Sequence, residues 1–364
     1  MDEKIKSRKE IKPLTSLRFF AALAVFFHHL PKFSTGEHHL YMTKGHLGVG
    51  FFFILSGFIL AYNYWDLFPS LDRASIKKMW AARFARIYPV HILTFLIFVP
   101  LVVQDIFSHG LAKGIVLTTL NLLLLQSFYP KERAFFSYNG VSWSISDEFF
   151  FYACFPFLIW YLHRIKMGGK KAFLWILLLF FLAVGLKFWV GRSLSAPMLT
   201  WAFDIFPPFR LIDFIIGILL YRLFCAVRDR LGPVKFSSTF FEILACLIFV
   251  GFFAVFSQSL ILSIFDSYFM LPMCVVIFTF AFSAGRISRF LSQRTFVLLG
   301  EISFSFYMIH APIIWWMDHH RLPFFKAHQG WSMLGALSLT MLASFLCYHF
   351  YEMPMRGWIK ERLH

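Results

Sequence analysis

Apolar segments of about the length needed to cross a lipid bilayer recur along the whole chain. A membrane-spanning helix needs about 20 mostly apolar residues. Hydrophobic residues make up 59% of the 364-residue sequence and charged residues only 15%, a balance that excludes a soluble globular domain. Eleven segments fit, roughly 14–31, 46–64, 88–106, 111–128, 143–162, 172–190, 206–224, 240–257, 264–284, 296–317 and 332–351. The sequence therefore predicts an all-α integral membrane protein.

The basic residues between these segments predict how the chain is threaded. They gather in the N-terminal residues, in 65–87, 163–171, 221–239 and 284–295, and in the C-terminal tail. Lysine and arginine are enriched in cytoplasmic loops, and all six stretches fall on one side only if segment 111–128 does not cross. We therefore expect about ten transmembrane helices, one re-entrant or interfacial segment near 108–130, and both termini in the cytoplasm.

Charge, cysteine content and segment spacing also limit the kind of protein. The net charge of +16 resides in short loops, which indicates contact with anionic lipids and no nucleic-acid partner. The five cysteines are scattered through apolar segments, so we predict neither a disulfide framework nor a metal site. No polar stretch is long enough for a soluble domain. We expect residues 1–364 to form a single membrane domain with no appended soluble domain.

The first apolar segment carries a cation and two histidines. Arg18 and His29 are eleven residues apart, which is about three helical turns or about 16 Å along the axis. Both side chains therefore lie on one helix face, whereas His28 points about 80° away from Arg18. A charge within a membrane segment is costly and marks a functional site by default. The alternative for His29 is a hydrogen bond that only packs helices together.

A second candidate group lies in WSISDEFFFY, residues 143–152. Ser144, Glu148 and Tyr152 recur every four residues and therefore share a helix face. With the predicted topology Glu148 lies in the outer half of the membrane, at the depth of His29. A carboxylate that orients an imidazole is a common arrangement for a general base, so we expect Glu148 to orient His29.

Arg83 and Arg86 form a third group, three residues apart in ARFARIYP. We expect a short amphipathic helix ended by Pro89. Such a pair can bind phosphate groups bidentately, or it can simply mark the cytoplasmic side and contact lipid headgroups.

Two further groups are weaker. Arg210 and Asp213 are three apart within one span and can pair with each other, and Ser303, Tyr307 and His310 share a face of a later span. The secondary candidates for the site are Ser144, Tyr152, Arg210, Tyr307 and His310.

These motifs, in this order, resemble the acyltransferase-3 family of bacterial membrane acyltransferases. The resemblance rests on the Arg18-to-His29 spacing and on FFFILSGFIL, ARFARIYP, WSISDEFFFY and SFSFYMIH, and it covers about residues 14–354. It implies an O-acyltransferase of the bacterial inner membrane. The reaction it implies moves an acyl group, usually acetyl, from cytoplasmic acyl-coenzyme A to a hydroxyl of an extracytoplasmic or lipid-linked glycan such as exopolysaccharide or lipopolysaccharide O-antigen.

The resemblance also implies roles for matching residues. Arg18 and His29 match the essential pair, Arg83 and Arg86 match the basic motif assigned to coenzyme A, and Glu148 matches the acidic residue of its motif. It implies acetyl-coenzyme A as donor, no metal, and a glycan or glycolipid acceptor, with membrane lipids and polysaccharide-assembly proteins as partners. We expect His29 to act as the base for direct transfer, with an acyl-enzyme on His29 or a serine as the alternative.

A secondary transporter or flippase for a glycan or lipid intermediate is the rival function. Many spans, intramembrane charges and a re-entrant segment are typical of transporters too. The sequence lacks two halves of similar pattern, and this favours the enzyme.

Overall fold

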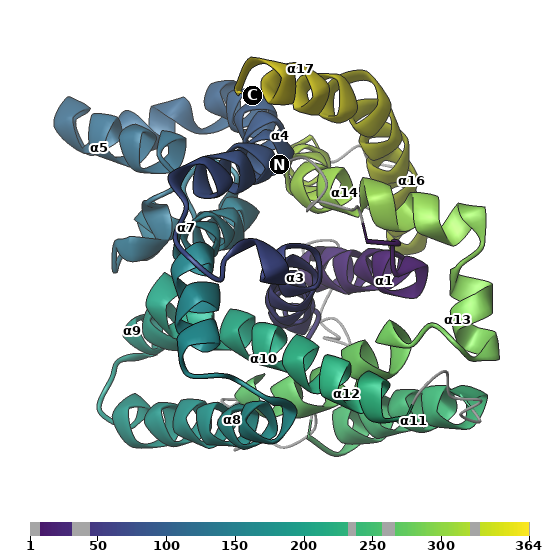
Figure 1. Ribbon diagram of the computed structural model, residues 1–364. Helices are drawn as coiled ribbons and strands as arrows, with labels where there is room; N and C mark the ends of the chain where they lie inside the picture. Colours follow the sequence, from purple (N-terminus) through teal and green to yellow (C-terminus); the bar gives the residue numbers. More distant parts are fainter. Residues whose placement is uncertain (1–7, 31–43, 232–237, 257–265, 321–327, 364) are drawn as a thin grey trace.

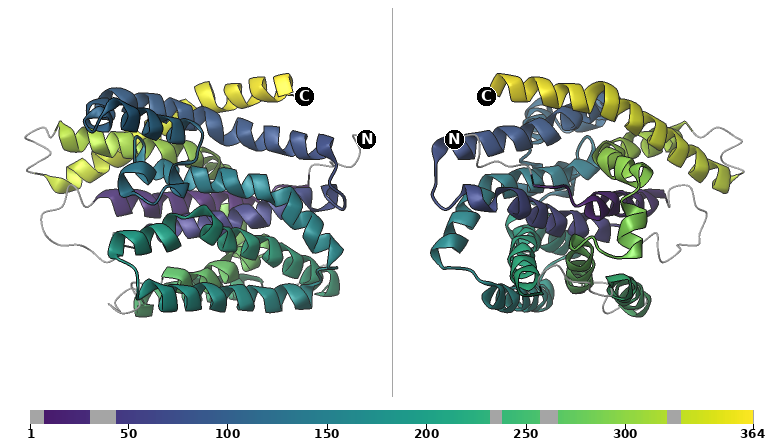
Figure 2. Two further views of the ribbon diagram at one scale, coloured as in Figure 1. Left: turned by 90° about the vertical axis from the view of Figure 1, so that its left-hand side faces the viewer. Right: turned by 45° about the vertical axis from the view of Figure 1, so that its right-hand side comes forward.

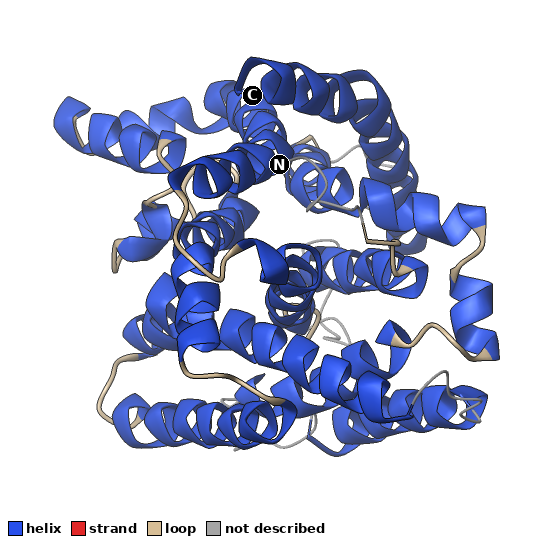
Figure 3. Ribbon diagram, viewed as in Figure 1, coloured by secondary structure: helices blue, strands red, loops and turns tan. Residues whose placement is uncertain are grey.

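The computed structural model describes residues 8–30, 44–231, 238–256, 266–320 and 328–363, and every regular element in these ranges is a helix (Figure 3). The predicted all-α class is therefore confirmed. Parts of the predicted basic stretches (1–7 and 232–237) and of three apolar segments (31, 257 and 264–265) lie outside the described residues. The longer helices are α1 (Lys12–His29), α3 (Leu47–Tyr64), α4 (Arg73–Phe107), α5 (Leu111–Leu122), α7 (Trp143–Arg164), α8 (Gly169–Gly191), α10 (Pro207–Leu231), α11 (Ser238–Phe256), α12 (Met270–Ala281), α14 (Arg294–His319), α16 (Gln329–Cys347) and α17 (Met353–Leu363).

Short helical turns connect some of these helices. They are η3 (Trp65–Leu67), η4 (Gln126–Phe128), α6 (Glu132–Phe135), η5 (Gly140–Ser142), α9 (Ala196–Thr200), η6 (Trp201–Ile205), η8 (Asp266–Phe269), α13 (Arg286–Leu291) and η9 (Tyr348–Glu352). Both η6 and η9 are single turns of π-helix, a form that occurs often at functional sites.

Seven helices of the described ranges are long and apolar enough to cross a bilayer, where the sequence predicts about ten. They are Leu47–Leu67, Arg73–Phe107, Gly140–Arg164, Gly169–Gly191, Ser238–Val255, Arg294–His319 and Gly330–Arg362. Helices α1 and α10 are as long as a span but fall outside this set because they carry charged and histidine side chains. The predicted number of crossings and the cytoplasmic termini remain predictions.

The predicted end of a helix at Pro89 is wrong. Helix α4 continues through Pro89 and Pro100 and is 35 residues long. Proline removes one backbone hydrogen bond, but apolar helices packed against neighbours tolerate that loss. The helix begins after Asp72, whose carboxylate accepts hydrogen bonds from the Ser75 hydroxyl and N–H, and these bonds lower the pKa of Asp72. Arg83 and Arg86 therefore belong to the long helix itself.

The segment near 108–130 forms the short helix α5 and the turn η4. With 12 residues α5 reaches about 18 Å, too short for a bilayer crossing. Gln126 Nε2 donates to the Ser142 carbonyl oxygen at 3.1 Å, and Ser146 Oγ donates to the Leu124 carbonyl oxygen at 2.6 Å. These bonds fix the N-terminal end of α7, which carries candidate site residues.

Helices α1 and α3 lie at the centre of the molecule, with α4 and α17 on one side and α8, α10, α11 and α12 in a layer on the opposite side (Figures 1 and 2). Helix α1 packs on α14, and α3 packs on α10. Gly57 and Gly217 allow the second contact, because a Cβ at either position would collide with a backbone oxygen of the facing helix. The central pair therefore contacts helices of both sides.

Candidate active site

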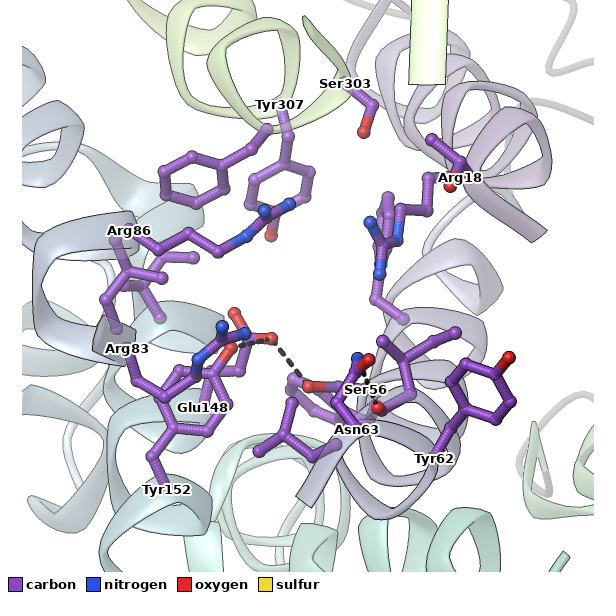
Figure 4. A pocket seen from close by; sticks show the side chains of 18 of the residues that line it. Arg18, Ser56, Tyr62, Asn63, Arg83, Arg86, Glu148, Tyr152, Ser303 and Tyr307 are labelled. Atoms are coloured by element: carbon purple, nitrogen blue, oxygen red, sulfur yellow. Dashed lines mark hydrogen bonds between the residues drawn. The ribbon is translucent and has the colours of Figure 1, made fainter. Parts of the chain in front are cut away.

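A cavity of about 280 Å³ is bounded by α1, α3, α4, α7, α14 and α17. Five arginines line it: Arg8, Arg18, Arg83, Arg86 and Arg356. In Figure 4 the side chains of Arg83 and Arg86 extend from one wall of this space, and that of Arg18 lies on the opposite wall. We call it the arginine cavity.

Most of these arginines lack an acidic partner. Arg8 pairs with Asp66 and donates to the Tyr221 hydroxyl at 2.5 Å. The other four arginines form no ion pair within the described ranges. The Nε atoms of Arg83 and Arg356 are buried without a hydrogen-bond acceptor. Such unpartnered donors are costly unless a ligand supplies acceptors, so the cavity suits a polyanion.

Glu148 lies in this cavity with two hydroxyl donors. Its Oε1 accepts hydrogen bonds from Tyr152 at 2.7 Å and from Ser56 of α3 at 3.0 Å. Ser144, Glu148 and Tyr152 all line the cavity, so the shared helix face predicted for them is confirmed. Glu148 also interacts electrostatically with Arg18. It offsets part of the positive charge of the cavity.

A second cavity, of about 360 Å³, contains the histidines of the first helix. His28, His29 and His46 line one part of it, and Asp204, Arg210 and Asp213 line another. We call it the histidine cavity. Arg210 and Asp213 form the ion pair that their spacing allows, with 2.9 Å between Nη2 and Oδ2.

His29 is oriented by its own helix and by α14. Its Nδ1 lies 2.9 Å from the Val25 carbonyl oxygen and 3.2 Å from His310 Nε2. His310 Nδ1 lies 2.6 Å from the Tyr307 carbonyl oxygen, to which it donates. His310 Nε2 is then an acceptor, and His29 Nδ1 carries the proton that points toward both acceptors. In the neutral His29 ring the lone pair is therefore on Nε2.

The predicted pair of His29 and Glu148 does not form. The two residues line different cavities, and the described hydrogen bonds of Glu148 go to Ser56 and Tyr152. Helical periodicity placed each side chain on the correct face of its own helix. The packing of α1 against α14 then brought His310 to His29, and Glu148 lies with the arginines.

Two side chains, Val49 and Tyr307, line both cavities. The Tyr307 hydroxyl lies 2.7 Å from Ser144 Oγ and donates to the Val141 carbonyl oxygen at 3.1 Å. Its ring packs edge-on against Phe52, with 6.0 Å between centroids. Val49 and Tyr307 therefore form the boundary between the cavities, and we call them the constriction.

Buried charges adjoin the histidine cavity. Lys187 of α8 is 3% exposed and its Nζ lies 2.7 Å from Asp204 Oδ1, whose side chain is 38% exposed. Asp147 is fully buried, and it interacts electrostatically with Arg210. Lys187 and Asp147 are therefore buried beside charged residues that line this cavity.

Sequence reasoning missed Arg356, Asp204 and Lys187 as site residues. In the sequence Arg356 belongs to the basic C-terminal tail, about one helical turn after Glu352. Lys187 is a lone lysine in an apolar span, which by itself indicates a buried partner. Asp204 could not be identified as that partner without the fold.

Comparison with known proteins supplies the family context. The family model described as "Acyltransferase domain" matches residues 12–349. The acyltransferase MdmB of Streptomyces mycarofaciens is 32% identical, over 91% of this chain and 86% of its own length. The O-acetyltransferase OatA of Staphylococcus aureus (strain NCTC 8325 / PS 47) is 23% identical over 97% of this chain, and the peptidoglycan O-acetyltransferase OatA of Listeria monocytogenes is 24% identical over 96%. This chain spans only 58% and 56% of the lengths of those two relatives. No solved structure matches the chain.

Proposed function

The chain belongs to this acyltransferase family, and from that premise we propose that it transfers an acyl group from acyl-coenzyme A to a hydroxyl of a glycan or glycosylated acceptor. The observation that carries the proposal is the pair of cavities that meet at Val49 and Tyr307. One offers unpaired arginines to an anionic donor, and the other offers an oriented imidazole to an acceptor.

The arginine cavity suits the phosphate groups of coenzyme A. Arg83, Arg86 and Arg356 line it without an ion pair to any described residue. Guanidinium groups bind phosphate through paired, charge-assisted hydrogen bonds. Arg18 stands on the opposite wall, eleven residues before His29 in α1. We propose that the donor enters from the arginine side, which the positive-inside pattern assigns to the cytoplasm.

His29 is the proposed general base. Nε2 takes the proton of the acceptor hydroxyl while the hydroxyl oxygen attacks the thioester carbonyl carbon. The carbon–sulfur bond then breaks, and the coenzyme A thiolate takes up the proton from the imidazolium. His310 and the Val25 carbonyl hold the ring so that Nε2 carries the lone pair. General-base assistance contributes roughly a hundred- to ten-thousand-fold in rate.

The proposed setting is the bacterial cytoplasmic membrane, with an acceptor that reaches the histidine cavity from the outer side. The curated OatA of Listeria is named a peptidoglycan O-acetyltransferase. For this chain we propose the broader class of cell-surface or exported glycans and glycolipids, with acetyl as the acyl group. Membrane lipids and polysaccharide-assembly proteins are the proposed partners.

The test uses the full chain in lipid nanodiscs with radiolabelled acetyl-coenzyme A and envelope glycans from a strain that lacks the protein. We expect label in the glycan, and His29→Ala should lower the rate about a hundred-fold or more while coenzyme A binding is retained. His109→Ala, at an exposed position outside both cavities, is the matched control. Near wild-type transfer by His29→Ala would remove His29 as the base.

Two further readouts separate the alternatives. Label that stays on denatured protein after removal of the acceptor would indicate an acyl-enzyme and overturn direct transfer. Mass spectrometry of surface glycans from cells with and without the protein addresses transport. Glycan that keeps its acyl groups but fails to reach the surface would favour a flippase.

A further inference from the structure

The boundary between the two cavities has a chemical consequence for the donor. In the proposed reaction the coenzyme A phosphates lie with the arginines, whereas His29 lines only the histidine cavity. The thioester carbon belongs to the coenzyme A bound by the arginines, and it must also come close to His29. The acyl group therefore lies at the constriction, between Val49 and Tyr307, because these are the side chains that both cavities share.

The two side chains of the constriction are buried and held in place. Val49 and Tyr307 are each 5% exposed, so both are packed on nearly all sides. Hydrogen bonds to Ser144 and to the Val141 carbonyl oxygen restrain the Tyr307 hydroxyl. Val49 lies on the central helix α3, and Tyr307 lies on α14, which packs against the central helix α1. Close-packed side chains of this kind resist displacement.

An apolar side chain adjoins the constriction on each side. Phe52 packs on the Tyr307 ring from the arginine side. Val25, whose carbonyl oxygen holds the His29 ring, lines the histidine side. An acyl chain at this point contacts carbon atoms on both sides, with no charged side chain among these four residues.

We propose that Val49 and Tyr307 select the acyl group of the donor by its size. This inference rests on the proposed function and adds the residues that discriminate between acyl groups. A longer chain needs space that the two side chains occupy. A single methylene in a hydrophobic pocket changes discrimination by roughly 10- to 200-fold.

The experiment measures binding, so that it does not depend on the acceptor. The affinities of coenzyme A, acetyl-coenzyme A, propionyl-coenzyme A and hexanoyl-coenzyme A are determined by calorimetry for the full chain in nanodiscs. We expect hexanoyl-coenzyme A to bind the wild type at least about tenfold more weakly than acetyl-coenzyme A. In Val49→Ala the ratio of the affinity for acetyl-coenzyme A to that for hexanoyl-coenzyme A should fall by about tenfold or more. Val49→Ile should lower the affinity for acetyl-coenzyme A and leave the affinity for free coenzyme A unchanged.

Val90→Ala is the matched control, because Val90 is equally buried and lines neither cavity. It should keep the wild-type ratio. An unchanged ratio in Val49→Ala that still binds coenzyme A, or equal binding of all acyl lengths by the wild type, would overturn the size selection. Failure of the wild type to bind free coenzyme A would instead overturn the donor site on which the inference rests.

Discussion

Replacement of Arg86 by glutamine should have opposite effects on the free protein and on the complex with coenzyme A. Arg86 lines the arginine cavity, and no ion pair is described for it. It repels Arg18, Arg356 and Lys360, and these like charges outnumber the one buried carboxylate, Glu352, that it attracts. A residue kept for structural reasons would stabilise the empty protein. A residue kept for an anionic ligand instead costs stability until that ligand is bound.

The magnitudes follow from the charges. A hydrogen bond to a charged group contributes about 1.5–3 kcal/mol, so Arg86→Gln should weaken coenzyme A binding by roughly 10- to 150-fold. Two like unit charges about 4 Å apart in a water-filled space repel by on the order of 1 kcal/mol, and this repulsion is relieved in the variant. The empty variant should therefore melt at a higher temperature than the wild type.

The assay is thermal unfolding of the protein in detergent, with and without a saturating concentration of coenzyme A. We expect the apparent Tm of empty Arg86→Gln to rise and the shift induced by coenzyme A to shrink. Arg73→Gln is the control, because Arg73 is exposed at the start of the same helix and lines neither cavity. A lower Tm in the empty variant with an unchanged ligand-induced shift would refute the ligand role of Arg86.

Three further changes probe the remaining parts of the site. Glu148→Gln keeps an acceptor oxygen for both hydroxyl donors but removes the charge that attracts Arg18, so the Tm of the empty protein should fall slightly while coenzyme A binds more tightly at low salt; weaker binding would contradict an electrostatic role. Gly57→Ala forces a Cβ against the Phe214 carbonyl oxygen, so glycan acylation should fall about a hundred-fold if the helices separate by about 1 Å; normal activity would show that the contact can relax. Asp204→Asn removes the charged hydrogen-bond partner of the buried Lys187 ammonium. Because Asp204 is partly exposed and Lys187 also interacts with Asp213, stability should fall by about 1.5–3 kcal/mol. The double variant with Lys187→Met should recover most of that loss in Tm.

The first helix shows what could be predicted for the site. The eleven-residue spacing fixed Arg18 and His29 on one face, and the structure places them in two adjoining cavities. The spacing could not tell which side chain of another helix meets His29. The predicted depth in the membrane suggested Glu148, but many residues lie at the same depth. The contact of His29 with His310 depends on how α14 packs against α1.

The long helix α4 shows a failure of a local rule. Pro89 was expected to end the helix, yet the chain continues for 18 residues beyond it. A helix packed in an apolar environment has no water to satisfy the exposed groups of a helix end, so interruption costs more than one lost hydrogen bond. The length of α4 was therefore set by its surroundings.

The sequence by itself determined the helical class, the membrane environment, and the side chains that share each helix face, because hydrophobicity and the 3.6-residue period act within one segment. It did not determine that Arg356 joins Arg83 and Arg86, that Lys187 pairs with Asp204, or that Val49 and Tyr307 stand between two cavities. These contacts join residues far apart in the chain. Only the close packing of specific helix surfaces decides which of them meet.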